Sequence, residues 1–246
     1  MTEAAFRTDD YAPAEALLRA ALDRAVREGD RRCEAAALDR LGMLTHFRAL
    51  HRGTRSEDAP AELALFEQAL AIRREIGDRA GIAQSLFGLG LVHQVLLRDW
   101  ETAMPLFRQA LAAADGVADD ITLSEIHRHI GSFHAVVEND LDVARRHFQL
   151  SADLRERHGD PRWIQGGTLA LGQTEVLAGR RAEAIRLLRL AVEQERAAGI
   201  RGHGAGQAAE WLVRAETSPP EGQPGADSAE SSRPGGASGD GRTSGG

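Results

Sequence analysis

A period of 41 residues runs through most of this chain and constrains its fold more than any other feature. Phe66, Phe107 and Phe148 stand 41 residues apart, and Leu188 follows 40 residues later. The same step recurs in three further columns, which are Ala69, Ala110, Ser151 and Ala191; Gly90, Gly131 and Gly172; and Asp78, Asp119 and Asp160. Four columns with one period indicate a chain built of stacked, similar units.

The first complete unit shows the same pattern with an insertion. The spacing is 48 residues from Gly42 to Gly90, from Asp30 to Asp78 and from Leu18 to Phe66. The extra residues fall in the polar stretch HRGTRSEDAP, residues 51–60, which carries no helical stripe. This stretch is therefore predicted to be a surface loop.

Each unit is predicted to contain two helices. The Asp column, with Asp30, precedes helical patterns and is suited to N-caps, each contributing about 1 kcal/mol. Gly29, Gly77 and Gly159 stand where a left-handed residue can end the preceding helix, and Ala118 breaks this column, so that turn should differ. In the second helix the spacings of four and three residues in Ala103, Phe107 and Ala110 place all three on one face.

Composition supports helices and excludes several classes of function. Hydrophobic residues make up 42% of the chain but aromatic residues only 4%, and Ala and Leu dominate, which favours helix over strand. The net charge of −7 argues against a nucleic acid or an anionic membrane as partner. The chain has no Lys, which phosphate-loop NTPases, protein kinases and Schiff-base enzymes require.

Cysteine usage and hydropathy indicate a cytoplasmic protein. Cys33 is the single cysteine, so an intramolecular disulfide or a thiolate metal cluster cannot form. The start of the chain is acidic and lacks the apolar core of a signal peptide, and no apolar run approaches the roughly 20 residues of a membrane span.

A family resemblance emerges from the Gly, Ala and Phe columns. The stretches LGLVHQVLLRDWETAMPLFRQAL, IGSFHAVVENDLDVARRHFQLSA and LGQTEVLAGRRAEAIRLLRLA resemble the tetratricopeptide repeat over about residues 11–216. The resemblance implies an all-α fold, a right-handed α-solenoid of antiparallel helix pairs. Because 41 residues exceed the usual 34, the helices should be longer. Such repeats are similar to those of kinesin light chains and of the sensor regions of actinobacterial regulators.

The pattern predicts one repeat domain, residues 1–216, followed by a tail. Its units cover residues 1–29, 30–77, 78–118, 119–159 and 160–200, with a capping helix over residues 203–216. Residues 2–9 are short for a first helix and suggest a degenerate cap. Pro105 should start its helix late or kink it. Residues 217–246 have no Leu, Ile, Val or aromatic residue and are predicted to be disordered.

No catalytic motif, metal site or cofactor is predicted. His127, His129, His134 and His147 cluster in one unit, but their spacing does not match the Glu-x-x-His pattern of helical metal sites. His127 and His134 fall where the family has aromatic packing residues, so a structural role is expected. The Gly-rich stretch 199–206 follows no strand and is interpreted as a turn.

The concave face is the candidate binding site, because in the family the first helices of successive units line a groove. Counted from the Gly column, its residues are Asp39, Met43, His46, Phe47, Gln84, Phe87, Leu91, Gln94, Glu125, Arg128, Ser132, Ala135, Leu169, Gln173 and Val176. Phe47 and Phe87 could equally pack against a neighbouring helix. Among the positions that bind a carboxylate in co-chaperone members, Arg128 alone could do so, which argues against that subtype.

We expect a non-catalytic scaffold that binds another protein or a peptide in an amphipathic groove. The alternative is a module that senses an effector or peptide and acts on a separate transcriptional regulator. The sequence leaves the oligomeric state open.

Overall fold

The computed structural model describes residues 11–53, 56–201 and 205–217, and this part of the chain contains helices and no strand. Its α-helices are α2 (Ala12–Glu28), α3 (Arg31–Arg52), α4 (Ala59–Glu75), α5 (Arg79–Leu91), α6 (Trp100–Ala114), α7 (Asp120–Val136), α8 (Leu141–His158), α9 (Pro161–Leu177), α10 (Arg181–Ala198) and α11 (Gln207–Thr217). A 3₁₀-helix (Ser56–Asp58) precedes α4, and a π-helical turn (Val92–Leu96) extends α5.

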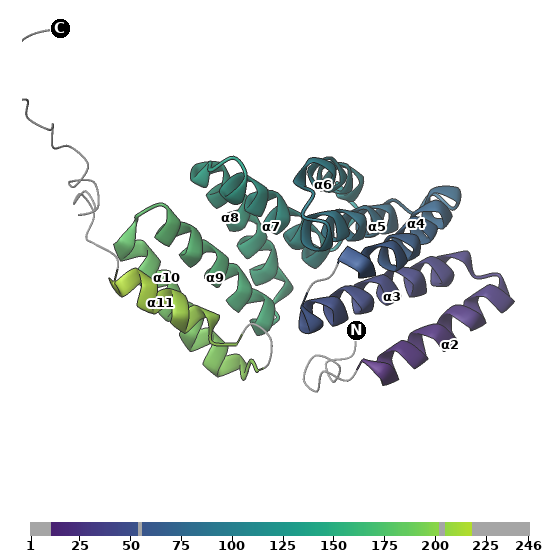
Figure 1. Cartoon of the computed structure of the whole chain (residues 1–246), viewed down its shortest axis with the longest axis horizontal. Helices are drawn as coiled ribbons and strands as arrows, with labels where there is room; N and C mark the ends of the chain where they lie inside the picture. Colours follow the sequence, from purple (N-terminus) through teal and green to yellow (C-terminus); the bar gives the residue numbers. More distant parts are fainter. Residues whose placement is uncertain (1–10, 54–55, 202–204, 218–246) are drawn as a thin grey trace, which may run out of the picture.

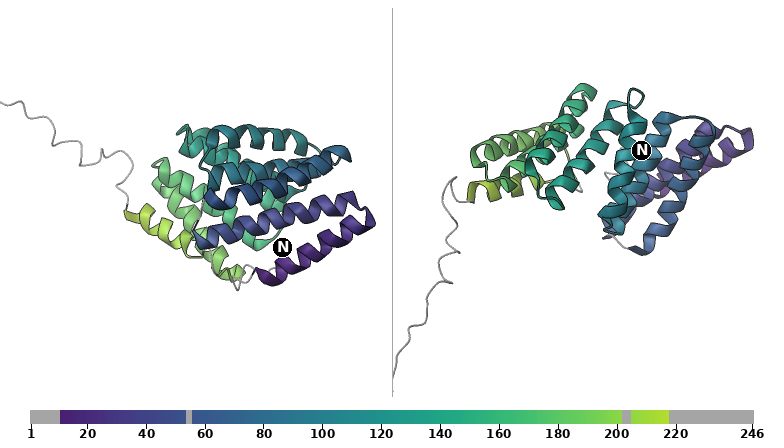
Figure 2. Two further views of the ribbon diagram at one scale, coloured as in Figure 1. Left: turned by 45° about the vertical axis from the view of Figure 1, so that its right-hand side comes forward. Right: turned by 90° about the horizontal axis from the view of Figure 1, so that it is seen from above.

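The helices follow one another along an arc (Figure 1). Each helix packs on the next one, and the tightest neighbours are the pairs α3–α4, α5–α6, α7–α8 and α9–α10. The first helix of each pair lies on the inner side of the arc and the second on the outer side. Figure 2 shows the same succession from two other directions. The fold is the expected all-α solenoid of helix pairs.

Side chains of the Asp column cap the first helices, as predicted. Asp30, Asp78, Asp119 and Asp160 each accept a hydrogen bond from a backbone N–H in the first turn of the helix that follows. Two further caps, Asp99 on α6 and Asp140 on α8, start second helices in the same way. Each cap satisfies a donor that the helix itself leaves without a partner.

The turns between units also follow the predicted glycines. Gly29, Gly77 and Gly159 have φ values of 69°, 68° and 83°, which lie in the left-handed region. The turn that contains Ala118 differs, since its left-handed residue is Gly116, with φ 70°. A glycine reaches this conformation without the steric cost that a Cβ would add.

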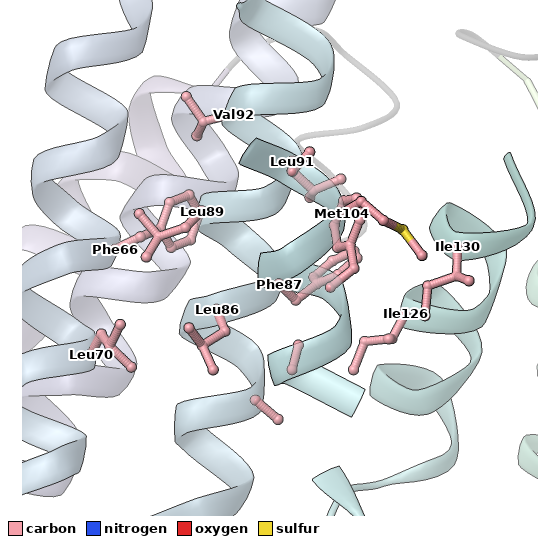
Figure 3. Close-up of a cluster of buried hydrophobic side chains, with 14 of the residues drawn as sticks. Phe66, Leu70, Leu86, Phe87, Leu89, Leu91, Val92, Met104, Ile126 and Ile130 are labelled. Atoms are coloured by element: carbon pink, nitrogen blue, oxygen red, sulfur yellow. The ribbon is translucent and has the colours of Figure 1, made fainter. Parts of the chain in front are cut away.

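The Gly column and the Phe column meet inside each unit. A Cβ built on Gly90 would lie 2.5 Å from Phe107, and one built on Gly42 would lie 2.7 Å from Phe66. Phe66 and Phe107 are almost fully buried, in a cluster that α3 to α7 share (Figure 3). The absence of a side chain on the first helix thus leaves the space that the ring of the second helix fills.

Two expectations about irregular segments need correction. The insertion at residues 51–60 is not simply a loop, because α3 continues to Arg52 and α4 begins at the buried Ala59. The end of α3 contacts the residue that precedes α2, since the ring of Tyr11 lies 5.6 Å from that of His51. Pro105 does not delay its helix, because Asp99 already caps α6 before Trp100.

The capping helix is α11, which begins at Gln207 rather than at residue 203. Its buried Ala208 and Ala215, with Trp211 and Leu212, cover the apolar surface of α9 and α10, as predicted. The expectations for residues 2–9 and 218–246 lie outside the described residues.

Replacing Gly90 with Ala should destabilise the protein by about 1–3 kcal/mol, because the new methyl group would collide with the Phe107 ring. The matched change Gly131→Ala should cost less, since the nearest atoms, on Phe148, on His147 and at the Ala144 carbonyl, lie 3.2 Å from the new Cβ rather than 2.5 Å, and alanine favours helix. Urea unfolding of both variants measures the difference. Equal effects would show that the close approach at Gly90 does not control packing.

A second repeated feature is the left-handed residue between the two helices of a unit. Arg98, Asn139 and Gly179 stand at corresponding positions, with φ values of 55°, 54° and 72°. Glycine adopts this conformation freely, and asparagine tolerates it better than a long side chain does. Arg98 is therefore the least suited of the three.

Arg98→Gly should raise the free energy of unfolding by up to about 1 kcal/mol because it relieves the left-handed strain. Gly179→Ala should lower this free energy by a similar amount, since no side chain obstructs the new Cβ and backbone conformation alone opposes it. Thermal unfolding followed by circular dichroism measures both. A destabilised Arg98→Gly variant would mean that the Arg98 side chain makes a stabilising contact that outweighs the strain.

Candidate functional site

The inner face of the arc is formed by α3, α5, α7 and α9, and the predicted site residues all belong to these helices or to the π-helical turn after α5. Their side chains differ widely in exposure. Asp39, His46, Phe87, Leu91 and Leu169 are buried, whereas Met43, Phe47, Gln94, Ser132 and Gln173 are partly exposed and Gln84 is exposed. Some of the predicted site residues are therefore buried, and others are accessible to a ligand.

Phe87 is a core residue. It is 8% exposed, and its ring lies 5.9 Å from the ring of Phe107 and 5.4 Å from that of His129. Leu91 is buried in the same cluster. Of the two interpretations of Phe87, packing against neighbouring helices is the one that this geometry supports, and a substitution there would test stability before binding.

A buried ion pair closes the inner face between α3 and α5. Arg73 of α4 lies 2.7 Å from Asp39 of α3, and the Ser85 hydroxyl of α5 donates to the same carboxylate across 2.9 Å. Arg73 also donates to the Gly81 carbonyl in the first turn of α5. Burial raises the pKa of Asp39 to about 6, although Arg73 and Ser85 act to lower it. These contacts give Asp39 a structural role.

His46 pairs with a buried acid in the same unit. His46 Nδ1 lies 2.8 Å from Glu62 Oε1, and Glu62 is fully buried. Burial raises the pKa of Glu62 above its usual value. Glu62 stands in the repeat column that elsewhere holds Ala103, Ala144 and Ala184, so this pair is a special feature of the first complete unit.

Glu125 of α7 is paired with two arginines, Arg128 of the same helix and Arg155 of α8. It accepts hydrogen bonds from the buried Arg155 and from Arg128, which is 3.0 Å away. Burial acts to raise the pKa of Glu125, but the charges of Arg128 and Arg155 outweigh it and lower this pKa to about 2. Glu125 is thus ionised at neutral pH and shared between two cations, so the group carries one excess positive charge.

His129 links this group to the neighbouring first helix. His129 Nδ1 donates to Gln94 Oε1 across 2.5 Å, and its Nε2 accepts from Arg128 across 2.5 Å. Burial and the charge of Arg128 lower the pKa of His129 well below its usual range, so the ring is neutral. Gln94, predicted to face a ligand, instead has its amide oxygen engaged between units.

Arg73 and Arg155 make equivalent contacts between successive units. They stand in one repeat column, 82 residues apart, and each donates to the carbonyl of the third residue after the next Asp cap, Gly81 or Trp163. Each also pairs with a carboxylate of its own first helix. The first and third complete units are thus joined to the units that follow by buried arginines.

The open part of the inner face lies on α7 and α9. Val136 is 70% exposed and Leu177 is 48% exposed, and each stands four residues after a partly exposed polar residue, Ser132 or Gln173. Sequence reasoning did not place Val136 and Leu177 in the site. The repeat register could have identified them, because both stand five residues after the Gly column. Phe47 and Val95 occupy this position in the earlier units.

Other features of the structure do not compete with this surface. An open hollow between α2, α3 and α4, lined by residues such as Leu22, Val26 and Leu38, lies at the far end of the arc. Among the described residues, no group of three or more His, Cys, Asp or Glu could hold a metal ion. None of the helices in the described ranges is long and apolar enough to cross a membrane.

Known proteins that resemble this chain include one protein family and two solved structures. Residues 61–115 match the model of the tetratricopeptide repeat. BtubC (BKLC) from P. vanneervenii has a similar crystal structure, with 21% identity and a TM-score of 0.57 over 78% of this chain and 76% of that one. The MamA protein is similar at 14% identity, with a TM-score of 0.43 over 74% of this chain and 92% of that one. No curated protein matches the sequence.

The matched segment, residues 61–115, identifies one tetratricopeptide repeat region within the chain. The described part of the chain has an all-α solenoid fold of helix pairs, and it shares this fold with BtubC. This fold generally supports protein interaction. The likeness to BtubC concerns the fold alone, because the identity is low.

Glu125→Ala should destabilise the protein by about 3–5 kcal/mol, because it leaves the buried Arg155 without its counter-charge. Arg128→Ala should cost only about 1 kcal/mol, since this side chain is 34% exposed and Arg155 would still neutralise Glu125. Urea unfolding of both variants tests the assignment. If the two changes proved equally mild, Glu125 would have to be a surface acid rather than part of a buried joint.

Proposed function

We propose that this protein is a non-catalytic cytoplasmic scaffold that binds a segment of another protein on the inner surface of α7 and α9. The proposal narrows the predicted concave face to its open part, which comprises Arg128, Ser132, Val136, Gln173, Val176 and Leu177. The observation that carries it is the exposure of Val136 and Leu177 at corresponding positions of successive first helices.

Two exposed apolar side chains on successive inner helices favour a partner that covers both. Complete burial of a Val or Leu side chain contributes about 1.5–3 kcal/mol, so one segment that crosses both helices gains from each. Single exposed apolar residues are common on protein surfaces, and the repeat register is what makes these two a pair.

The polar neighbours of this pair suit a peptide or a helix. Ser132 and Gln173 each lie one helical turn from an exposed apolar residue, and the Gln173 amide can donate to and accept from a backbone. Arg128 adds one partly exposed guanidinium next to Glu125. An apolar segment with polar groups between its anchors meets both kinds of residue.

The N-terminal half of the inner face is less suited to the same task. Asp39 and His46 are buried in pairs with Arg73 and Glu62, and Phe87 and Leu91 belong to the core. A ligand there would have to break these contacts before it met the side chains. The half formed by α7 and α9 needs no such rearrangement at Val136 and Leu177.

The double change Val136→Asp and Leu177→Asp should leave the protein folded and weaken partner binding by well over tenfold, because it places charges where apolar anchors are expected. Both side chains are exposed, so their replacement should not disturb the core. Partners captured from a lysate by the wild-type protein supply the ligand, and titration with each purified partner measures the dissociation constant.

A matched control uses the outer helices. Leu150 of α8 and Leu190 of α10 are 47% and 39% exposed, so Leu150→Asp with Leu190→Asp makes the same chemical change away from the proposed surface. The proposal requires that this control binds like the wild type. A partner whose affinity falls with the outer pair and survives the inner pair would place binding on the convex side and refute the proposal.

A further inference from the structure

One helix pair carries two histidines where the two preceding units carry leucines. In the first two complete units the corresponding positions hold the pairs Leu38 and Leu65, and Leu86 and Leu106. Each of these pairs belongs to a hydrophobic cluster between the helices of its unit. In the next unit the same two columns hold His127 on α7 and His147 on α8. A titratable pair thus replaces an apolar contact.

The two imidazoles face each other directly. His127 Nδ1 and His147 Nδ1 are 3.0 Å apart, and the ring centroids are 5.2 Å apart. This distance fits an N–H donor on one ring and a free nitrogen on the other. When both rings are protonated, both nitrogens carry hydrogen, the bond cannot form, and two like charges face each other.

A third histidine extends the group. His134 stacks on His147, with an interplanar angle of 13° and centroids 5.7 Å apart, and its Nδ1 donates to Glu138 Oε2 across 2.6 Å. All three rings are partly buried between α7 and α8. Additional charge at His147 would therefore act on both neighbouring rings in a partly desolvated space.

We propose that the α7–α8 pair is an acid-sensitive joint, in which protonation of His127 and His147 breaks their hydrogen bond and loosens the contact between the two helices. This inference is independent of the proposed function. α7 also carries Ser132 and Val136, so its displacement against α8 would move part of the inner surface whether or not a partner binds there.

The charged groups around His127 and His147 do not neutralise the charge that protonation of the two rings would add. Arg146 of α8 adds a positive charge near His147, and Glu138 supplies one negative charge, which is engaged by His134. From α9, Glu175 approaches α8 but pairs with Arg145 at 2.6 Å. α6 meets α7 through an aromatic contact, in which the rings of Trp100 and Phe133 lie 5.8 Å apart.

Burial favours the neutral rings. Burial, with the charges of His127, His134 and Arg146, lowers the pKa of His147 to about 4, and burial lowers the pKa of His127. A histidine whose pKa is lower in the folded than in the unfolded chain reduces stability as the pH falls below its unfolded value of about 6.5. The loss grows between about pH 6.5 and pH 4, and it is absent above pH 7.5.

The test compares the wild type with His127→Leu/His147→Leu, which introduces the leucine pair of the two preceding units. Between pH 7.5 and pH 5 the ratio of unfolded to folded chain should rise on the order of tenfold more in the wild type. Urea unfolding of the full chain at both pH values measures this ratio. His158→Gln, at an exposed histidine, is the control and should keep the wild-type pH response.

Two further measurements keep the test decisive if the leucine variant does not fold. Leu86→His/Leu106→His should make the protein more sensitive to acid than the wild type, because it creates a second such pair. In the wild type, an NMR titration should show one histidine signal still neutral at pH 5.5, which is absent from His147→Gln, and a second that protonates below the usual range of histidine, which is absent from His127→Gln. Parallel acid responses of the wild type and the leucine variant, or ordinary titration of both rings near pH 6.5, would overturn the proposal.

Discussion

The contact between a helical glycine and the large side chain opposite it sets the distance between the two helices of each unit. Gly42, Gly90 and Gly172 leave room for Phe66, Phe107 and Leu188, and in each case an added Cβ would lie under 3.0 Å from that side chain. Because a solenoid is stabilised mainly by contacts between neighbouring helices, the same spacing propagates along the chain. The unit with Gly131 is looser at this point, and it is also the unit that carries the facing histidines.

Buried arginine–carboxylate pairs add to these apolar contacts and separate the inner face into buried and exposed parts. Arg73 and Arg155 each connect a second helix to the carboxylate of its own unit and to the first turn of the next one. Such buried pairs are costly to desolvate and tolerate little displacement, so they restrict how the units sit against each other. The repeat register places two acids, Asp39 and Glu125, on the concave face. Both are paired with buried arginines, so their role is structural and they are not available to a partner. What remains for a partner is the surface between these pairs and the C-terminal cap.

Much of the fold could be predicted from the sequence because its determinants are local and repeated. The Asp caps, the left-handed glycines and the Gly–Phe columns depend on spacing alone, and all of them occur as expected. The candidate site was harder to predict. A register gives the angle of Phe87 or Asp39 around its helix, but not how closely the next first helix approaches, and that distance decides their burial. The pairing of His46 with Glu62 occurs in one unit alone, and the end of α3 contacts Tyr11 of the preceding unit, so no column of residues contains either feature. Val136 and Leu177, in contrast, could have been found by extending the register by one position.

The central claim is that Gly90 is required because the Phe107 ring occupies the space of its missing side chain. A double-mutant cycle tests this claim directly, with Gly90→Ala introduced into the wild type and into Phe107→Ala, and with unfolding free energies measured in urea. We expect Gly90→Ala to be neutral or stabilising once the ring is removed, since alanine is favoured over glycine within a helix by about 1 kcal/mol. An equal cost of Gly90→Ala in both backgrounds would contradict the account, because the glycine would then be needed for some reason other than the ring.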